Sequence, residues 1–475
     1  MNRRAYKLFV VGLAIAGWIA AAATQGTLNR ARAELGLTHA PPLENAPPVL
    51  AFTTVALGGF RGVIANALWI RAMEMQESGR YFELVQLADW ITKLQPRNAA
   101  AWKHHAMNLG YNISRTFSDP RDRWLWVQRG IELLRDEALV YNPGSAEIYH
   151  ELAWHFQHKI GLSMDDAHVY YKTQLAHEMS RLLGVDKPDY RPLIEPKTED
   201  EQRRAAVLRN KLKLEPRRMA GIEAKYGPLE WRLPEAHAIY WADTGLERCG
   251  KTGTLKLRRV IWQSMQASVR RGRLIPVHAE GRFEWGPNLD LLPAAEAVYQ
   301  QFIDESPEER GAVEPGHKFF LREAVFLLYV NNRIREARMW MDKLQQLYPD
   351  LVPPGTDLDA FALGYLGEIV KGTTVDRLQA TIEGLLVNAY FSLAIGDTGR
   401  AEGMDRLAQR AWERHQAKFA GQEQRVGLPP LKALRERVLG ELLAPGEGGL
   451  HPQLQAQLRT ALNLPGATTN APPQK

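Results

Sequence analysis

Cysteine is almost absent from this chain, since Cys249 is its single cysteine. A disulfide within the chain is therefore excluded, and no cysteine pair exists for a zinc or haem motif. A lone thiol with no designated base beside it is predicted to be inert. The near absence of cysteine suits a reducing or an oxidising compartment, so it does not choose between them.

Other signals are missing as well. No run alternates apolar and polar residues long enough for a convincing strand. Gly58-Gly59 precedes a helical pattern, but it lacks the lysine and the preceding strand of a phosphate-binding loop. The net charge of +6 is spread over 475 residues rather than gathered on one arm, which disfavours a nucleic-acid binder. We expect no cofactor and no nucleic-acid partner.

The N-terminus carries an apolar run, Leu8–Ala23, preceded by Arg3, Arg4 and Lys7. The run is shorter than the ~20 residues that span a bilayer comfortably, although Thr24–Leu28 extends it. We predict an uncleaved membrane anchor, with cleavage after Ala21–Ala23 or a buried helix as the alternatives. The basic residues favour a cytoplasmic N-terminus. The body would then lie outside the inner membrane of a bacterium-like cell, in the periplasm.

A repeating helical pattern takes its phase from the stretch between Gly79 and Pro96. In a helix-turn-helix unit of about 34 residues, Gly79 takes the turn, where positive φ is wanted, and Pro96 closes the second helix. In the next unit Trp102 takes the large position of the first helix, and Ala106 takes the small one, where helices approach closely. The same frame places these residues of later units: Tyr149, Leu152, Ala153 and Phe156; Asn332, Ala337 and Pro349; and Ala389, Gly396, Ala401 and Ala408.

This pattern resembles the tetratricopeptide repeat family, and the resemblance implies an all-α solenoid. The repeats are degenerate. Leu84 and Ile131 stand where the family has alanine, and Ala167 lies two residues late in the second helix of the third unit. The blocks Leu57–Pro143 and Gly227–Ala242 also look similar to a group of bacterial, membrane-anchored repeat proteins of uncharacterised function, which implies an envelope setting and no activity.

The predicted organisation is a tethered array of repeats with a break in its middle. Its proposed parts are an anchor or signal segment (1–27), a Pro-rich linker (28–55), repeats (56–185), a charged linker and helix (186–230), C-terminal helical repeats (231–445) and a flexible tail (446–475). Within the C-terminal part, the Gly/Pro/Arg-rich excursion 272–288 is expected to hold a short strand pair, and Leu431–Leu443 a last amphipathic helix that caps the array.

Candidate chemistry is sparse. Glu151, His155 and His158 have the spacing that puts ligands for zinc or iron on one helical face, but no fourth ligand is indicated. These residue types are also ordinary on an exposed helix, so we predict no metal site and no catalytic residue. Asp165-Asp166 is interpreted as a pair at a helix start, where carboxylates favour the helix dipole.

A binding groove is the sharper hypothesis. In stacked helix pairs, one set of first-helix positions faces the concave side, and aromatic, Met and Lys side chains there would form a surface for a peptide or helix. The alternative is that the linker or the charged helix fills this trough. The predicted groove residues are Asn66, Trp69 and Met73 in the first unit, Lys103, Met107 and Tyr111 in the second, and His150, Trp154 and His158 in the third.

The sequence therefore predicts a membrane-tethered, tetratricopeptide-like scaffold, which binds a protein or peptide partner in a bacterial envelope complex and makes or breaks no bond. The alternative is a helical envelope enzyme or polymer-binding protein, with or without a metal, that has the His- and Trp-lined region as its cleft.

Overall fold

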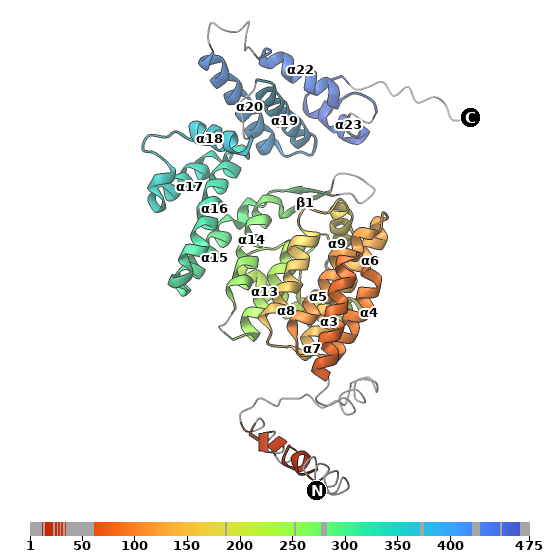
Figure 1. Cartoon of the computed structure of the whole chain (residues 1–475). Helices are drawn as coiled ribbons and strands as arrows, with labels where there is room; N and C mark the ends of the chain where they lie inside the picture. The colour runs from red at the N-terminus through yellow and green to blue at the C-terminus, as the bar shows by residue number, and fades with distance from the viewer. Residues whose placement is uncertain are drawn as a thin grey trace, which may run out of the picture. The chain divides into compact units, whose positions relative to one another are not determined.

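The computed structural model describes residues 61–185, 188–250, 253–276, 283–370, 375–419, 428–446 and 449–465, with scattered positions between 12 and 34. These residues are helical apart from one short β-hairpin, so the all-α prediction is confirmed (Figure 1). Half of the apolar run 8–23 lies outside the described residues. Among those described, no helix is both long and apolar enough to cross a membrane. The chain divides into two compact units, Met1–Arg80 with Gln86–Gln95, and Tyr81–Val85 with Pro96–Lys475.

The first unit contains α3 (Arg61–Glu77) and most of α4 (Tyr81–Leu94). Gly79 lies between the two helices with φ +70°, as its predicted turn position requires. A residue with a Cβ is strained in this region of φ, which explains why glycine stands here. On α3, Ala65, Ala72 and Met75 are buried.

The second unit begins with three long helices, each of which contains a π-helical turn. The first is α5 (Ala99–Met107), η3 (Asn108–Ile113) and the 3₁₀ turn η4 (Ser114–Thr116). The second is α6 (Pro120–Glu132), η5 (Leu133–Ala138) and α7 (Leu139–Tyr141). The third is α8 (Ala146–Trp154) and η6 (His155–Ile160). In a π-turn one extra residue is inserted into the helix, so the side chains after it are re-aimed.

The helix that packs most extensively along α8 and η6 is α13 (Pro234–Arg248). The repeat frame placed the second helix of this unit near Ala167 instead. There the structure has α9 (His168–Leu183), which makes fewer contacts with η6. The difference has a simple cause: α13 is apolar enough to be buried along its whole face, and every residue from Pro234 to Gly245 is buried.

The segment predicted as a charged linker and helix forms packed helices: α10 (Arg191–Ile194), α11 (Glu199–Ala206), the π-turn η7 (Val207–Lys211) and α12 (Pro216–Tyr226). Leu208, Met219 and Tyr226 are buried in the core shared with α8 and α13. Many of its charges are paired within the fold, as in the contacts of Lys211 with Glu178 and of Arg218 with Asp243. With α9 these elements form an insertion between α8 and α13.

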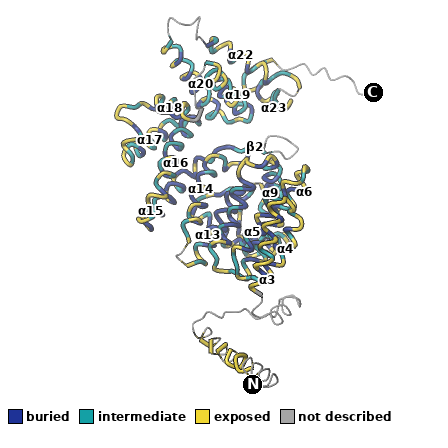
Figure 2. The backbone as a smooth tube through the Cα atoms, in the orientation of Figure 1, coloured by how far each residue is buried: buried dark blue, intermediate teal, exposed yellow. Residues whose placement is uncertain are grey.

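The rest of the chain consists of consecutive helices that pack on their neighbours: α14 (Leu255–Arg271), η8 (Leu289–Leu291), α15 (Leu292–Glu305), η9 (Pro307–Glu309), α16 (Arg310–Val330), α17 (Ile334–Leu347), η10 (Pro349–Leu351), α18 (Leu358–Val370), α19 (Val375–Ala394) and α20 (Thr398–Lys418). Helices α13 and α14 form a hairpin, as do α16 with α17 and α19 with α20. Figure 2 shows buried backbone running through these helices, with exposed positions on their outer sides.

Two local predictions are confirmed here. The expected strand pair is the antiparallel hairpin of β1 (Arg273–Pro276) and β2 (Phe283–Gly286), in which Arg273 pairs with Gly286. Asn332 and Gly396, the predicted turn residues, have φ of 60° and 79° between their helices.

The C-terminal end differs from the prediction. The expected last helix is present as α22 (Leu431–Leu442), but α23 (Pro452–Ala461) follows it. The expectation of a flexible tail from residue 446 is therefore wrong for residues 452–461. The reason is that Leu454 and Leu458 recur on one side of α23 and are buried in a small cluster with Ala394.

Candidate ligand-binding surface

Three parallel strips of side chains in the second unit define one surface, which we call the α8 face. The strip on α5–η4 carries Lys103, Met107, Tyr111 and Arg115. The strip on α8–η6 carries His150, Trp154 and His158, and that on α14 carries Lys256, Arg259, Gln263 and Arg270. Within each strip the residues recur every three, four or seven positions, which keeps them near one side of a helix. Helix α8 packs against both α5 and α14, so the strips are neighbours.

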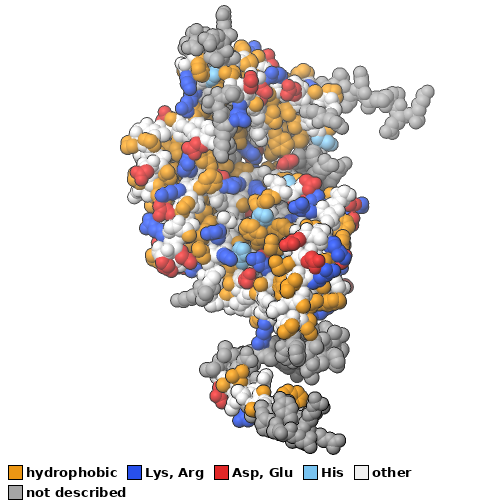
Figure 3. All heavy atoms as spheres, viewed as in Figure 1, with side chains coloured by type: hydrophobic (Ala, Val, Ile, Leu, Met, Phe, Trp, Pro, Cys, Tyr) orange, Lys and Arg blue, Asp and Glu red, His pale blue; other side chains and the backbone are white. Residues whose placement is uncertain are grey.

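The centre of the α8 face is a column of rings. The indole of Trp154 stacks on His158 at a centroid distance of 4.4 Å and on His150 at 5.9 Å, with interplanar angles of 15° and 20°. The hydroxyl of Tyr111 lies 3.2 Å from Nδ1 of His158, which joins the column to the α5 strip. In Figure 3 histidine side chains reach the surface of the molecule among apolar and basic ones.

Of the three candidate metal ligands, Glu151 and His155 lie together in the core, 3.5 Å apart between Oε1 and Nδ1, and His158 lies away from them. Glu151 and His155 are 2% and 0% exposed, whereas His158 is half-buried at the surface. The imidazole of His155 donates from Nδ1 to the backbone carbonyl of Glu151 at 2.9 Å. Its other edge faces two helices: a Cβ added at Gly110 would lie 2.9 Å from Nε2 of His155, and one at Gly130 would lie 3.3 Å away. His155 is therefore a packing residue between three helices.

Two open cavities flank His158. One, of about 480 Å³, is lined by Tyr111, Arg115, Arg123, His158, Lys159, Met164, Asp165 and Asp166. The other, of about 410 Å³, is lined by Trp154, Gln157, His158, Leu162, Gln263, Gln266, Ala267, Arg270 and Arg271. Both cavities belong to the α8 face, and His158 forms the ridge between them.

A buried ion-pair network forms one wall of the first cavity. Asp165 accepts from Lys159 at 2.5 Å and from Arg123 at 2.9 Å, and its other contacts are the backbone N–H of Ala167 and the hydroxyl of Tyr171. Burial alone would raise the pKa of Asp165, but these hydrogen bonds and the two cations hold it below its usual value. The sequence had placed Asp165-Asp166 at a helix start; it gave no sign of Arg123, which comes from a distant helix.

Burial governs the other titratable groups of the surface. It lowers the pKa of His150 to about 4, with help from the charges of Lys256, Lys103 and Arg259. Burial and then the charge of Lys159 lower the pKa of His158, so both imidazoles are neutral at pH 7. Burial raises the pKa of Glu151 to about 7, although Lys103 opposes this shift from 4.0 Å.

The structure brings six of the nine predicted groove residues together on the α8 face, three on α5–η3 and three on α8–η6. The other three, Asn66, Trp69 and Met73, lie on α3 in the first unit. There the indole N–H of Trp69 lies 3.5 Å from the side-chain oxygen of Gln95.

Sequence reasoning missed the α14 strip. The four-residue spacing could have revealed Arg115, because it continues the series from Lys103. Nothing local in the sequence indicates that α14 lies beside α8, because the insertion α9–α12 separates them along the chain.

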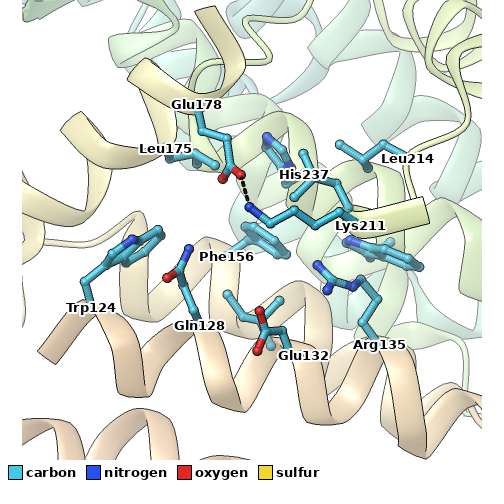
Figure 4. Close-up of a pocket in the computed structure, with 13 residues that line it drawn as sticks. Trp124, Gln128, Glu132, Arg135, Phe156, Leu175, Glu178, Lys211, Leu214 and His237 are labelled. Carbon is cyan, nitrogen blue, oxygen red and sulfur yellow. Dashed lines mark hydrogen bonds and ion pairs between the residues drawn. The ribbon is translucent and has the colours of Figure 1, made fainter. Parts of the chain in front are cut away.

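A smaller cavity, of about 50 Å³, lies where this insertion meets the helices α6, η6 and α13 (Figure 4). Trp124, Gln128, Phe156 and His237 are among its lining residues, and the 2.7 Å ion pair of Lys211 with Glu178 crosses it. A volume of this size is enough for ordered water. Burial lowers the pKa of His237 to about 4, and the ring of this residue hydrogen bonds to the carbonyl of Trp231.

Within the part of the chain that the structure describes, no three His, Cys, Asp or Glu side chains are grouped so that they could hold a metal ion. Comparison with known proteins finds no matching family model, no matching curated protein and no matching solved structure.

Proposed function

We propose that this protein is a scaffold of degenerate, tetratricopeptide-like helical repeats that binds a protein or peptide partner on the α8 face. The proposal rests first on the ordered succession of helix hairpins, with Gly79, Asn332 and Gly396 at the turns where the repeat frame expects them. Such arrays present extended surfaces built from successive first helices. The role is recognition, and no bond is made or broken.

The observation that carries this proposal is the half-exposed ring column between the two cavities. Aromatic side chains at the centre of a hollowed surface are typical anchors of polypeptide interfaces. Here Trp154 and His158 are fixed by stacking and by the contact with Tyr111, so binding would cost little side-chain ordering. Apolar Met107, Leu162 and Met164 stand near the rims, exposed by 37%, 36% and 74%.

We further propose that the scaffold is tethered to a bacterial inner membrane by residues 8–23, with its body in the periplasm. The support is in the sequence alone: an apolar run, basic residues before it and a Pro-rich segment after it. A compartment-sensitive reporter fused after Lys475, together with sequencing of the mature N-terminus, tests this topology. A cytoplasmic reporter would overturn the location, and a terminus near Thr24 would replace the anchor by secretion.

The binding role is tested by site-specific photo-crosslinking in the native cell, with the photoreactive residue at Met107. The matched control places it at Met339, which is 67% exposed on α17. We expect a defined partner to crosslink at Met107 and not at Met339, and Trp154→Ala to abolish the crosslink while thermal unfolding changes little. Equal crosslinking at both positions would contradict the proposal. So would stoichiometric zinc or iron that a His158→Ala variant loses.

A further inference from the structure

The chemistry of the partner can be read from the α8 face. We propose that the face binds an acidic polypeptide segment through its side-chain carboxylates, arranged as two acidic clusters about five residues apart. This inference rests on the proposed function, because it takes the partner to be a polypeptide bound on this face.

The rings of the column present their edges, not their faces. One face of Trp154 is covered by His158 and the other by His150. A sugar ring or a base, which binds by stacking on a flat aromatic face, therefore finds no free indole face here. Ring edges carry the positive end of the aromatic quadrupole. The indole N–H of Trp154 is engaged by Tyr111, so the column's edges attract an anion through the quadrupole and through the imidazoles. The column thus offers electropositive edges, which suit an anion.

His158 adds a directed donor. Burial and the charge of Glu151 raise the pKa of Tyr111, so its phenol keeps its proton. The neutral His158 can then accept this proton at Nδ1, 3.2 Å from the hydroxyl, which places its own N–H on Nε2. With this tautomer assigned, His158 is a hydrogen-bond donor on the ridge between the cavities.

Three cations of the α8 face are uncompensated. Arg115, Lys256 and Arg259 are exposed, and none forms an ion pair with another described residue. Lys103 lies at 3.7 Å from Glu147 and 4.0 Å from Glu151, at the limit of an ion pair. The lowered pKa of His150, caused by burial and then by Lys256, Lys103 and Arg259, is in keeping with a positive potential at this end.

The acids of the face are already engaged. Asp165 is held by Lys159 and Arg123, and Asp166 by Arg123 at 2.7 Å. They remain on the wall of the first cavity, however, and Glu147 stands beside Lys103. A ligand with an unbroken row of charges, such as a nucleic acid, would meet these carboxylates. A polypeptide can place neutral residues there and keep its acids for the cations.

The cations lie at two ends of the face. Lys103, Lys256 and Arg259 are near His150, whereas Arg115 lines one of the cavities that meet at His158, and Arg270, which is already paired with Glu323, lines the other. From Lys103 to Arg115 the strip on α5–η4 rises about 18 Å, at ~1.5 Å per residue. An extended chain covers that distance in about five residues, at ~3.3 Å each. This separation gives the spacing of the two acidic clusters.

The test uses the full-length protein in detergent and fluorescein-labelled peptides with amidated C-termini, read by fluorescence anisotropy. Each peptide carries two Glu pairs, separated either by about four serines, to match the ~18 Å span, or by none. We expect the spaced peptide to bind, and Arg115→Gln or the double change Lys256→Gln with Arg259→Gln to weaken it about tenfold. The matched control is Arg335→Gln with Arg338→Gln on α17, two exposed arginines without an ion pair to a described residue, which should change affinity less than twofold.

Several results would overturn the inference. If a peptide with Gln in place of Glu binds equally well, the face does not recognise carboxylates. If the unspaced peptide binds equally well, the proposed spacing is wrong. A need for a free C-terminus would assign the site to a terminal carboxylate. Tighter binding of a single-stranded oligonucleotide or of anionic vesicles, sensitive to Arg115→Gln, would assign it to another class. A Met107 crosslink that persists while the Glu peptides fail leaves the scaffold standing and rejects the acidic segment; loss of both rejects the scaffold.

Discussion

The helices around the α8 face and the helices from α16 to α20 are built differently. The first group, from α5 to α9, contains three π-turns and buried charges such as Lys159 and Asp165. The second group is made of regular α-helices, and no π-turn occurs in the described residues after 211. Its hairpins turn at Asn332 and Gly396, with the positive φ that the repeat frame predicts.

The difference teaches how an array of packed helices can acquire a candidate site. In the regular group each side chain stays on the helix face that its sequence spacing gives. In the π-turn group His155 lies inward beside Glu151, against Gly110 and Gly130, while His158, within the π-turn, lies at the surface between two cavities. The π-turns thus coincide with the candidate site, as such turns often do. Four predictions probe this comparison.

The largest effect is expected from Asp165→Asn, in the π-turn group. The change leaves Lys159 buried without its carboxylate, and breaking a buried pair costs about 3–5 kcal/mol. The pKa of Asp165 is lowered in the folded state, so its contribution is present at neutral pH and is lost as pH falls below its ordinary value near 4. The free energy of unfolding, from denaturant titration at pH 7 and pH 3, measures this: the gap between wild type and variant should shrink at pH 3.

The matched change in the regular group is Asp405→Asn. Asp405 accepts two hydrogen bonds from Arg435, at 2.9 and 2.7 Å, but both side chains are partly exposed. A pair of this kind contributes less than about 1 kcal/mol. If the two variants lose equal stability, burial does not distinguish the two regions.

The second prediction concerns glycines at close approaches. A Cβ at Gly403 would lie 2.2 Å from the backbone oxygen of Val330, which cannot rotate away, so Gly403→Ala should cost about 3 kcal/mol or more. At Gly110 the obstacle is the His155 ring at 2.9 Å, and Gly110→Ala should cost about 2 kcal/mol, because alanine also favours the helix. Denaturation midpoints give both values. If Gly403→Ala costs less stability than Gly110→Ala, the backbone at the α16–α17 turn can shift to make room. The regular group would then be the more easily deformed of the two.

The third prediction is a pH dependence that belongs to the π-turn group. The pKa of Glu151 is raised to about 7 from its ordinary 4.5, so the folded state binds the proton more strongly and stability falls as pH rises through that window. Glu151→Gln removes this loss. We expect the free energy of unfolding to increase by on the order of 2 kcal/mol at pH 8, because the cost of burying the amide offsets part of the gain. At pH 4.5 we expect little change.

The Glu151→Gln variant retains the histidines whose pH dependence opposes that of Glu151. His150, His155 and His237 have pKa values lowered to about 4, so they destabilise the fold as pH falls from 6.5 toward 4. The midpoint temperature of thermal unfolding should therefore rise more steeply between pH 4.5 and pH 8 in Glu151→Gln than in the wild type. Parallel curves for the two proteins would show that Glu151 titrates normally.

The same comparison shows which parts of the structure could be predicted from the sequence. Helix hairpins, turn residues and the strand pair could be predicted, because glycine or asparagine at a positive φ and periodic apolar residues are local signals. The adjacency of Lys103, Tyr111, Trp154 and His158 followed from the repeat frame. The partnership of α8 with α13 could not be predicted, because the insertion α9–α12 interrupts the frame and carries helical signals of its own.

The π-turns were equally invisible. Nothing in the spacing of Glu151, His155 and His158 distinguishes an α-helix from a π-turn, so the three were placed on one face. Gly110 and Gly130, where a Cβ would meet His155, indicate that His155 is buried, but only once the three helices are known to lie side by side.

The smallest effect is expected at a helical glycine of the regular group. Gly364 lies within α18, is exposed, and has no atom within 4 Å of the position that a Cβ would take. Gly364→Ala should therefore stabilise the protein by about 0.5–1 kcal/mol, because alanine loses less backbone entropy in a helix. The denaturation midpoint should rise while the affinity of the Glu peptides stays unchanged. A loss of stability would show that α18 is strained and that Gly364, like Gly403, is required by the packing of the regular group.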